Sequence, residues 1–435
     1  MSISKHENNN YEQAVASLKL NLKFGIRLGL DRLEKLLFLL NNPEKDFKTV
    51  HVAGTNGKGS VCFMFSSIFT HNKYKTGLFI SPYVKDLRES IQLNNQMITR
   101  ERFAEIYQKV SFYEKALKND GINLTYFEML TAMALEFFSE ENCDIVTLEV
   151  GLGGDLDATN VVKNTVLSVI TSISFDHKSL LGNTLKEITL KKCGIIKKNC
   201  PVVVSPGQKK IVNKTILDYS RILGNKVKIS NITKIKEISS DLYSGTVFLY
   251  KGKKFELPLL GQHQLDNVMT VFTGLEFLKK HFTFTYENVF AGLKKIYCPA
   301  RFEILNRKPF TIIDGAHNKD GISALSKSLK KYLKNRTLIG ITGMLSDKEV
   351  EVCFKNILPE FETIFTIEVK NERTMSLRAI TNLAKKFHQK VFPAESLKRA
   401  LTMAQDICSE NSAIIIFGSF YIARVWFESE CNKKF

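Results

Sequence analysis

The stretch HVAGTNGKGS, residues 51–60, decides the fold of this chain because it joins a strand to a helix through a glycine-rich turn. The residues before the turn have the apolar, β-branched character of a buried strand, and those after it carry apolar side chains at helical spacing. Backbone N–H groups at Gly54, Gly57 and Gly59 can hold phosphate oxygens, and the helix N-terminus adds positive potential. Lys58 supplies a full charge for the outer phosphates. The pattern predicts a nucleotide-binding phosphate loop.

The spacing within this loop departs from the usual P-loop, which has four residues between its first Gly and the Gly-Lys pair. Two residues separate Gly54 from Gly57 here, and Gly59 stands where Ser or Thr would normally hold Mg²⁺. A plain glycine-rich turn before a helix is the structural alternative. The succession of strand, turn and helix favours the phosphate loop over that alternative.

Length and composition are those of an ordinary globular enzyme. The chain has 435 residues, of which 44% are hydrophobic and 24% charged, and this is enough for two domains with their own cores. We expect no signal peptide and no membrane-spanning segment, because no apolar run approaches the ~20 residues that cross a bilayer. The eight cysteines include no Cys-x-x-Cys pair, so we expect neither a zinc site nor a disulfide framework. Free thiols fit a reducing, cytoplasmic location.

The net charge of +18 comes mainly from lysines spread along the whole sequence. Nucleic-acid binding is one explanation of such a charge. The lysines, however, form only short clusters, such as those at 191–198 and 251–254, without the interleaved aromatic residues of a base-stacking surface. We therefore predict a solvated basic surface that attracts anionic ligands such as nucleotides, with no nucleic-acid or membrane partner.

Apolar, strand-like runs alternate with helical patterns along most of the chain, which predicts α/β architecture with parallel sheets. In the first part, strands are expected at 49–53, 76–80, 145–149, 166–172 and 202–204. A β-rich stretch is expected at 227–259. Helices are expected at 32–41, 102–117, 127–138 and 264–280. The first ten residues are polar, and we expect them to be disordered.

Residues 297–300, Tyr-Cys-Pro-Ala, have the character of a linker, and the alternation restarts after them. Strands are expected at 310–313, 337–342, 363–368 and 413–417. Helices are expected at 321–333, 349–357, 377–387 and 397–407. We therefore predict a P-loop-type parallel-sheet ATPase domain at 1–297 and a smaller Rossmann-like domain at 298–435.

Two acidic segments follow predicted strands, at the edge where parallel sheets place their ligands. Glu149 ends the strand at 145–149 and precedes the turn GLGG. If that strand neighbours the phosphate loop, Glu149 can hold a Mg²⁺ ion that bridges nucleotide phosphates. A carboxylate that caps the next turn is the alternative. Asp176 and His177 follow the strand at 166–172. An Asp-His pair is weak evidence for a functional site by itself, and it becomes a candidate here because it lies at the same edge of the sheet.

Eight segments together give the chain a resemblance to the folylpolyglutamate synthase and dihydrofolate synthase family of the Mur ligase superfamily. They occur in the family's order and cover nearly the full length of the chain. The segments are GTNGKGS (54–60), Ser81-Pro82, EVGLGG and LDATN within 149–160, DHKSLLGNT (176–184), KCGIIK (192–197), GQHQLDN (261–267), ARFE (300–303) and DGAHN (314–318). One such motif is weak evidence, whereas eight in register are highly specific.

The resemblance implies an ATP- and Mg²⁺-dependent ligase that adds L-glutamate to dihydropteroate, to folates or to both, in folate biosynthesis. The chemistry agrees with the residues, because ATP must first phosphorylate the carboxylate before an amine can displace the phosphate. Both steps build negative charge, which calls for a metal, a lysine and backbone donors rather than a nucleophilic side chain. The enzyme is expected to be a monomer with its active site in the cleft between the domains.

The resemblance also implies roles for individual residues of this sequence. ATP would be held by Gly54, Thr55, Asn56, Gly57, Lys58, Gly59, Ser60, Asn267, Arg301 and Asp314. The Mg²⁺ ligands would be Ser81, Glu149 and His177. Catalytic roles would fall to Lys58, Lys192, His177 and His317. The pterin contacts would be Leu28, Gly29, Leu30, Thr125, Tyr126, Phe127, Glu128, Leu156, Asp157 and Ala158.

Some of these assignments leave alternatives open. Lys192 matches a lysine that the family carbamylates with CO₂, which would give the metal region an oxygen ligand, and the sequence does not decide whether this chain is modified. Tyr126 and Phe127 could pack on the flat pterin ring or belong to the core. A site for a monovalent cation such as K⁺ is also left open.

Five positions depart from the family's pattern, one of them being Cys193, which replaces Ala. Tyr83 replaces the His that usually follows Ser-Pro, and Ser90 stands where an Arg commonly follows Glu89. Asp155 occupies a position often filled by Arg, which puts an anion beside an anionic substrate. Lys191 stands where Glu is frequent. These departures remove no predicted metal or phosphate ligand, but they leave substrate preference open.

Two other functions are alternatives. A Mur ligase of peptidoglycan precursors shares the ATP chemistry, but it usually carries a UDP-binding domain before the phosphate loop, where this chain has only about fifty residues. A basic, nucleotide-regulated binding protein with a degenerate site is disfavoured by the intact Lys58, Glu149, His177 and Lys192. The sequence does not distinguish a dihydrofolate synthase, a folylpolyglutamate synthase or an enzyme with both activities, nor does it set the glutamate chain length.

Overall fold

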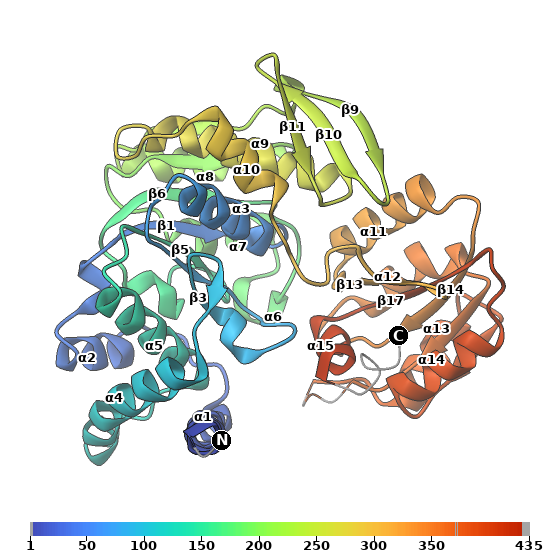
Figure 1. Cartoon of the computed structure of the whole chain (residues 1–435), viewed down its shortest axis with the longest axis horizontal. Helices are drawn as coiled ribbons and strands as arrows, with labels where there is room; N and C mark the ends of the chain where they lie inside the picture. The colour runs from blue at the N-terminus through green and yellow to red at the C-terminus, as the bar shows by residue number, and fades with distance from the viewer. Residues whose placement is uncertain (1–2, 370, 372, 429–435) are drawn as a thin grey trace.

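Three β-sheets organise the chain, and helices cover both faces of the two larger ones (Figure 1). The computed structural model describes residues 3–369, 371 and 373–428. Residues 48–229 supply an eight-stranded sheet, residues 235–257 a three-stranded sheet and residues 303–417 a six-stranded sheet. Both larger sheets are mostly parallel, so the predicted α/β class is confirmed.

The eight-stranded sheet has the strand order β4-β3-β2-β5-β1-β6-β7-β8. Its strands are β1 (Lys48–Ala53), β2 (Thr76–Phe79), β3 (Ile91–Leu93), β4 (Gln96–Met97), β5 (Ile145–Glu149), β6 (Thr165–Ile170), β7 (Val202–Val204) and β8 (Val227–Ile229). Strands β3 and β4 form an antiparallel hairpin at one edge. Because β1 lies between β5 and β6, the loop that follows it opens at the middle of the carboxyl edge of the sheet.

Helices form layers on both faces of this sheet. The helices are α1 (Ile3–Lys19), α2 (Asp31–Leu39), α3 (Lys58–His71), α4 (Arg100–Asn119), α5 (Tyr126–Glu140), α6 (Lys178–Leu181), α7 (Leu185–Cys193), α8 (Lys210–Ile222), α9 (Gln262–Leu278) and α10 (Tyr286–Lys294). Helices α1, α2, α4 and α5 pack on one face through a core that includes Phe79 and Leu148. Helices α3, α9 and α10 pack on the other face through Val50 and Val52. Helices α7 and α8 bury Val202 and Val204 at the β7 side.

The six-stranded sheet forms the second body, with the order β12-β13-β17-β14-β15-β16. Its strands are β12 (Glu303–Arg307), β13 (Phe310–Asp314), β14 (Thr337–Thr342), β15 (Thr363–Thr366), β16 (Val391–Pro393) and β17 (Ser412–Phe417). Its helices are α11 (Lys319–Tyr332), α12 (Val350–Ile357), α13 (Leu377–Lys385), α14 (Leu397–Asp406) and α15 (Phe420–Glu428). Helices α11, α12 and α13 share one core and α14 and α15 share another, so the sheet is covered on both faces.

The small antiparallel sheet of β9 (Ile235–Asp241), β10 (Gly245–Tyr250) and β11 (Lys253–Leu257) extends from the first body toward α11 of the second (Figure 1). Its contact with α11 is polar. Ser240 Oγ lies 2.7 Å from Tyr332 Oη, and Tyr332 Oη also accepts a hydrogen bond from Gly261 N at 3.3 Å. One tyrosine of the second body therefore holds both the small sheet and the start of α9.

The strands and helices expected from the sequence are present, and their observed ends differ from the expected ones by at most two residues. The prediction for the first ten residues is wrong, because residues 3–10 belong to α1. Further along α1, Tyr11, Ala14, Val15 and Leu18 repeat at helical spacing and are buried in the core of the first body. The polar start of the chain thus extends a helix that is anchored by its apolar stripe.

None of the helices in the described part of the chain is long and apolar enough to cross a membrane.

Helix α10 approaches α3 so closely that Gly292 has no room for a side chain. A Cβ at this position would lie 2.9 Å from Ile68 Cα and 3.0 Å from Ile68 N. Ser67 Oγ also donates a hydrogen bond to the Gly292 carbonyl at 2.8 Å. Since α3 begins at the phosphate loop, this contact fixes the helix on which the loop depends.

We predict that Gly292→Ala lowers the free energy of unfolding by about 1–3 kcal/mol, because the added methyl group pushes α10 away from the backbone of α3. Urea denaturation followed by circular dichroism measures this loss. The control is Lys295→Ala at the exposed end of α10, which should change stability by less than about 0.5 kcal/mol. An unchanged unfolding midpoint for Gly292→Ala would contradict the close packing.

Candidate active site

One cavity of about 1020 Å³ lies where the carboxyl ends of the two larger sheets face each other. Its walls come from the loops after β1, β2, β5 and β6 on one side and after β13 and β17 on the other. The residues given a role from the sequence all line this cavity, with the exception of Leu30. Leu30 directly precedes α2 and packs against the apolar core of the first body, so the structure does not place it at the pterin site.

The phosphate loop turns into α3 at Gly57, which has a φ of 91° in the left-handed region. A Cβ there would lie 2.5 Å from Asn267 Oδ1, so the loop and α9 approach each other closely. Lys58 is the first residue of α3, and its Nζ donates a hydrogen bond to Thr55 O at 3.3 Å, which folds the side chain back over the loop. The loop therefore presents amides, a helix N-terminus and one ammonium group together, as phosphate binding requires.

Two reciprocal contacts fix the position of this loop. Thr55 Oγ1 donates to Ser174 O and accepts from Ser174 N, both at 3.1 Å. Asn56 Nδ2 donates to Asn318 Oδ1 at 3.2 Å, and Asn318 Nδ2 donates to Asn56 Oδ1 at 3.0 Å. Asn318 is also the N-cap of α11. The second pair therefore ties the phosphate loop to the first helix of the second body.

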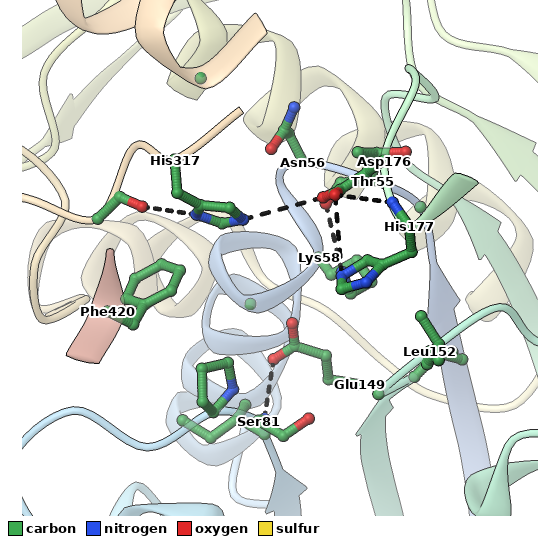
Figure 2. A pocket seen from close by; sticks show the side chains of 18 of the residues that line it. Thr55, Asn56, Lys58, Ser81, Glu149, Leu152, Asp176, His177, His317 and Phe420 are labelled. Atoms are coloured by element: carbon green, nitrogen blue, oxygen red, sulfur yellow. Dashed lines mark hydrogen bonds and ion pairs between the residues drawn. The ribbon is translucent and has the colours of Figure 1, made fainter. Parts of the chain in front are cut away.

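Glu149 ends β5 and buries its carboxylate beside the phosphate loop. The carboxylate accepts a hydrogen bond from Ser81 N at 3.3 Å, and Figure 2 shows the two residues facing each other. Burial raises the pKa of Glu149, and the charges of Lys58 and Arg301 oppose that rise. A buried carboxylate next to a serine offers hard oxygen donors, which suit Mg²⁺. Glu149 and Ser81 would hold that ion.

His177, the third predicted ligand, contacts the second body instead. Its Nε2 lies 3.1 Å from Lys348 Nζ, and Asp176 Oδ1 accepts from the same ammonium group at 2.6 Å. Burial, together with the charge of Lys348, lowers the pKa of His177 to about 4, so the ring is neutral and Nε2 offers its lone pair to a cation. Within the described residues, no three His, Cys, Asp or Glu side chains gather closely enough to hold a metal by themselves. Phosphate oxygens and water would complete the shell of a bound Mg²⁺.

Lys192 on α7 also reaches the phosphate loop. Its Nζ donates a hydrogen bond to Gly54 O at 2.8 Å, and the residue is only 4% exposed. Burial lowers the pKa of Lys192 to about 7, the charge of Lys58 adds to this shift, and Asp176 and Asp157 oppose it. A large fraction of Lys192 is therefore neutral at physiological pH, and a neutral amine can react with CO₂.

Asp314 and Arg301 reach the cavity from the second body. Asp314 ends β13, and its carboxylate accepts hydrogen bonds from Phe302 N and Ala316 N, both at 2.8 Å. Burial raises the pKa of Asp314, and the charge of Arg301 opposes this rise. The Arg301 guanidinium lies over the Phe420 ring, 4.3 Å from its centre. The ring thus holds the arginine in place, and the opposite charges of Arg301 and Asp314 attract each other.

His317 follows the same strand and faces Asp176 across the cavity (Figure 2). Its Nδ1 lies 2.8 Å from Gly315 O, so Nδ1 carries the proton and donates it to the carbonyl. Nε2 is then an acceptor, 3.9 Å from Asp176 Oδ2. Burial, together with the charge of Lys348, lowers the pKa of His317 to about 4, so the ring is neutral. The structure therefore offers an unprotonated nitrogen to the cavity at this point.

The predicted pterin end lies around the start of α5. Thr125 Oγ1 accepts from Glu128 N at 3.2 Å, and Thr125 N donates to Glu128 Oε2 at 2.7 Å, which makes a capping box. Arg32 forms an ion pair with Glu128 at 2.8 Å. Tyr126 and Phe127 line the cavity and also pack against the core of the first body, so the two alternatives for these rings are compatible.

Comparison with known proteins shows the family to which this chain belongs. Residues 52–274 match the Mur ligase middle domain, and residues 300–420 match the Mur ligase glutamate ligase domain. The dihydrofolate synthetase of Saccharomyces cerevisiae is 31% identical over 421 residues, which cover 91% of this chain and 96% of that protein. The chain belongs to the Mur ligase family.

Further relatives place this Mur ligase with the dihydrofolate synthases and folylpolyglutamate synthases. The enzyme of Bacillus subtilis that carries both names is 32% identical over 363 residues, 81% of this chain and 83% of that protein. The Mycobacterium tuberculosis folylpolyglutamate synthase complexed with ADP has a TM-score of 0.88 and 27% identity, covering 97% of this chain and 99% of that one. The E. coli FolC structure in complex with DHPP and ADP has a TM-score of 0.84 and 25% identity, covering 97% and 98%.

Two of the departures from the family pattern form a single ion pair. Lys191 Nζ lies 3.0 Å from Asp155 Oδ2, and both side chains are partly exposed. Neither residue lines the cavity. This Mur ligase therefore carries the cation and the anion in reversed positions, and the negative charge of Asp155 is balanced locally rather than set against the substrate.

A third departure, Tyr83, takes part in a contact between the two bodies. The Arg424 guanidinium on α15 lies 3.5 Å from the centre of the Tyr83 ring, and Arg424 Nη2 donates to Tyr83 O at 2.9 Å. In the opposite direction, Lys85 Nζ lies 4.2 Å from the centre of the Phe427 ring on α15. We call these two cation–π pairs the interdomain clasp. Because Tyr83 and Lys85 follow Ser81 in one loop, the clasp ties a predicted metal ligand to the second body.

Sequence reasoning missed Lys348 and Arg424. The side chain of Lys348 is 6% exposed and pairs with Asp176. A signal for it exists, because the segment GMLSDKE follows β14 at the same kind of strand end that singled out Glu149. No local pattern points to Arg424, since its partner Tyr83 lies 341 residues away in the chain.

We predict that Arg424→Gln lowers kcat for ATP turnover about tenfold, because the loop that carries Ser81 loses its cation–π contact with α15. Small-angle X-ray scattering should show a larger radius of gyration as the two bodies move apart. Arg399→Gln, which removes an exposed arginine from α14, is the control and should leave both quantities unchanged. If Arg424→Gln matches the wild type in rate and radius, the clasp does not hold the bodies together.

Proposed function

We propose that this chain joins the amino group of L-glutamate to the carboxylate of dihydropteroate and, as a second activity, to that of reduced folates. As a member of its family it is an ATP- and Mg²⁺-dependent amide-bond ligase. The observation that carries the proposal is the single cavity, which connects the phosphate loop, the residues around Thr125 and the segment around His317. The E. coli relative in complex with DHPP and ADP supports a pterin and a nucleotide in one site.

The chemistry follows from the charges that the cavity presents. Transfer of a phosphoryl group from ATP converts the substrate carboxylate into an acyl phosphate, and Lys58 with the loop amides neutralises the charge on the transferred group. Glu149 and Ser81 would hold Mg²⁺, which would further neutralise the charge on the phosphate oxygens. The amino group of glutamate then attacks the acyl carbon, His317 Nε2 accepts the proton that it loses, and phosphate departs as the amide forms.

Water competes with glutamate for an acyl phosphate, so the cavity must be closed during the reaction. Contacts across the two bodies serve this purpose. Asn56 pairs with Asn318, and Lys348 of the second body contacts Asp176 and His177 of the first. These contacts hold the second body over the phosphate loop, which is where the intermediate would form.

The names of the relatives favour this function over a ligase of peptidoglycan precursors and over a nucleotide-regulated binding protein. We also propose a monomer that works in the cytoplasm, with domains at residues 1–297 and 298–435. The cysteines in the described residues are unpaired, which fits a reducing compartment. Size-exclusion chromatography with light scattering tests the monomer.

The proposed function predicts phosphate release with ATP, Mg²⁺, L-glutamate and dihydropteroate, and in a separate reaction with tetrahydrofolate in place of dihydropteroate. Turnover with both substrates would establish both activities, and turnover with one would assign a single activity. Lys58→Ala should lower kcat by at least about 10²-fold while the circular dichroism spectrum stays unchanged, because the transferred phosphoryl group loses its ammonium partner. A folded wild type that binds ATP but turns over neither substrate would contradict the proposal.

We further predict that Lys192 is carbamylated in the active enzyme. Lys192→Ala should lower kcat about 10²-fold, and a short carboxylate such as propionate should restore part of the rate by supplying the missing oxygen donors. Lys191→Ala is the control, because its side chain lies outside the cavity, and it should stay active. Restoration by methylamine rather than by propionate would show that the free amine, not a carbamate, is needed.

A further inference from the structure

A buried histidine in β1 has no part in the chemistry described above. His51 is 0% exposed and lies within the eight-stranded sheet, where β1 pairs with β5 and β6. Its Nε2 lies 2.8 Å from Thr159 Oγ1. Its Nδ1 is buried as well, and no described residue offers it a hydrogen bond. A polar ring that is buried with one nitrogen unpartnered costs stability.

The Thr159 hydroxyl extends this contact to the wall of the cavity. Thr159 Oγ1 lies 2.6 Å from Asp157 Oδ1, and Thr159 N donates to the same oxygen at 3.0 Å. The other carboxylate oxygen, Asp157 Oδ2, accepts from Leu152 N at 2.8 Å. Asp157, Leu152 and Ala158 line the cavity at its predicted pterin end, whereas His51 and Thr159 lie behind them. We call His51, Thr159 and Asp157 the buried relay.

The direction of the hydrogen bonds in the buried relay follows from the unpartnered Nδ1. Burial lowers the pKa of His51 to about 3 and the charge of Lys197 adds to this, so the ring is neutral and carries one proton. With that proton on Nε2, His51 donates to Thr159, and Thr159 donates to an ionised Asp157. With the proton on Nδ1, a buried N–H would have no acceptor and Asp157 would have to be protonated to complete the relay. Buried N–H groups without partners are rare, which favours the first arrangement.

The charge of Asp157 needs this support. Burial raises the pKa of Asp157, and the hydrogen bond from the Thr159 hydroxyl is the first of the contacts that oppose the rise, followed by the amides of Leu152, Thr159 and Gly151. If the hydroxyl turned away, the carboxylate would lose its strongest side-chain partner.

We infer that His51 is a positioning residue for the heterocycle-binding end of the active site. By donating Nε2–H to Thr159, it keeps the Thr159 hydroxyl directed at Asp157 and keeps that carboxylate ionised and oriented. The inference rests on the proposed function, since it takes Asp157 to face the pterin. The ligand class that an ionised carboxylate favours here is a heterocycle with neighbouring amino and ring N–H donors.

The sharpest test compares two substitutions of Thr159, which is fully buried. Thr159→Val keeps the shape and loses the hydroxyl, and it should raise KM for dihydropteroate about tenfold while KM for ATP stays within about twofold. Thr159→Ser keeps the hydroxyl and should stay close to the wild type. A role in packing alone predicts the opposite order, because Val fills the space of Thr and Ser leaves a gap. That opposite order, or equal KM values for the two variants, would overturn the inference.

A second pair tests the histidine itself. His51→Gln carries an amide that can donate to Thr159, and it should keep KM for dihydropteroate within about threefold of the wild type. His51→Leu has no donor and should raise this KM about tenfold, again with KM for ATP unchanged. Equal effects of the two substitutions on KM for dihydropteroate would show that the donor at Nε2 does not matter.

The tautomer can be read in the unaltered protein, whatever the variants do to folding. In a ¹⁵N-histidine-labelled sample, the eight histidines give separate ring signals, and His51→Gln identifies the signal of His51. We expect a proton on Nε2 and none on Nδ1, and a proton on Nδ1 would overturn the relay. This measurement needs no turnover. A wild type without ligase activity would therefore contradict the proposed function only. The tautomer of His51 tests the buried relay independently of that activity.

Discussion

The amide pair of Asn56 and Asn318 joins the carboxyl edges of two parallel sheets, and the shape of the cavity depends on that contact. Asn56 belongs to the phosphate loop after the central strand β1, and Asn318 caps the first helix after β13. Parallel strands collect their loops and helix N-termini at this edge, so both bodies direct positive potential and polar side chains into the same space. A ligand bound there contacts both bodies at once.

The charges around the phosphate loop are strongly coupled because they are buried together. Lys58 and Lys192 approach the loop from different helices, and their proximity adds to the effect of burial in lowering the pKa of Lys192 to about 7. Glu149 is buried beside the same loop, where burial raises its pKa. A nucleotide with its metal ion supplies the anionic and cationic charge that these groups lack, which is why a ligand of that class fits the site.

The departures from the family pattern show how a fold tolerates substitution when partners change together. Asp155 and Lys191 each look unfavourable when considered singly, yet they form one ion pair outside the cavity. Tyr83 loses the imidazole that is usual at its position, and its ring accepts the Arg424 guanidinium instead. Each substitution is explained by a contact with a residue that is distant in the chain. The sequence alone therefore does not reveal why the substituted residue is tolerated.

The sequence by itself determined the strand–loop–helix unit at the phosphate loop, the alternating elements and the motifs at strand ends, because periodicity and turn chemistry are local properties. It missed α1, because the polar first ten residues led us to expect disorder there, and it assigned to the pterin site Leu30, which the structure packs against the core rather than along the cavity. Only the tertiary structure decided that Lys348 contacts His177 and that His51 reaches Asp157 through Thr159. These contacts join residues more than a hundred positions apart, and their geometry depends on how whole sheets and helices pack.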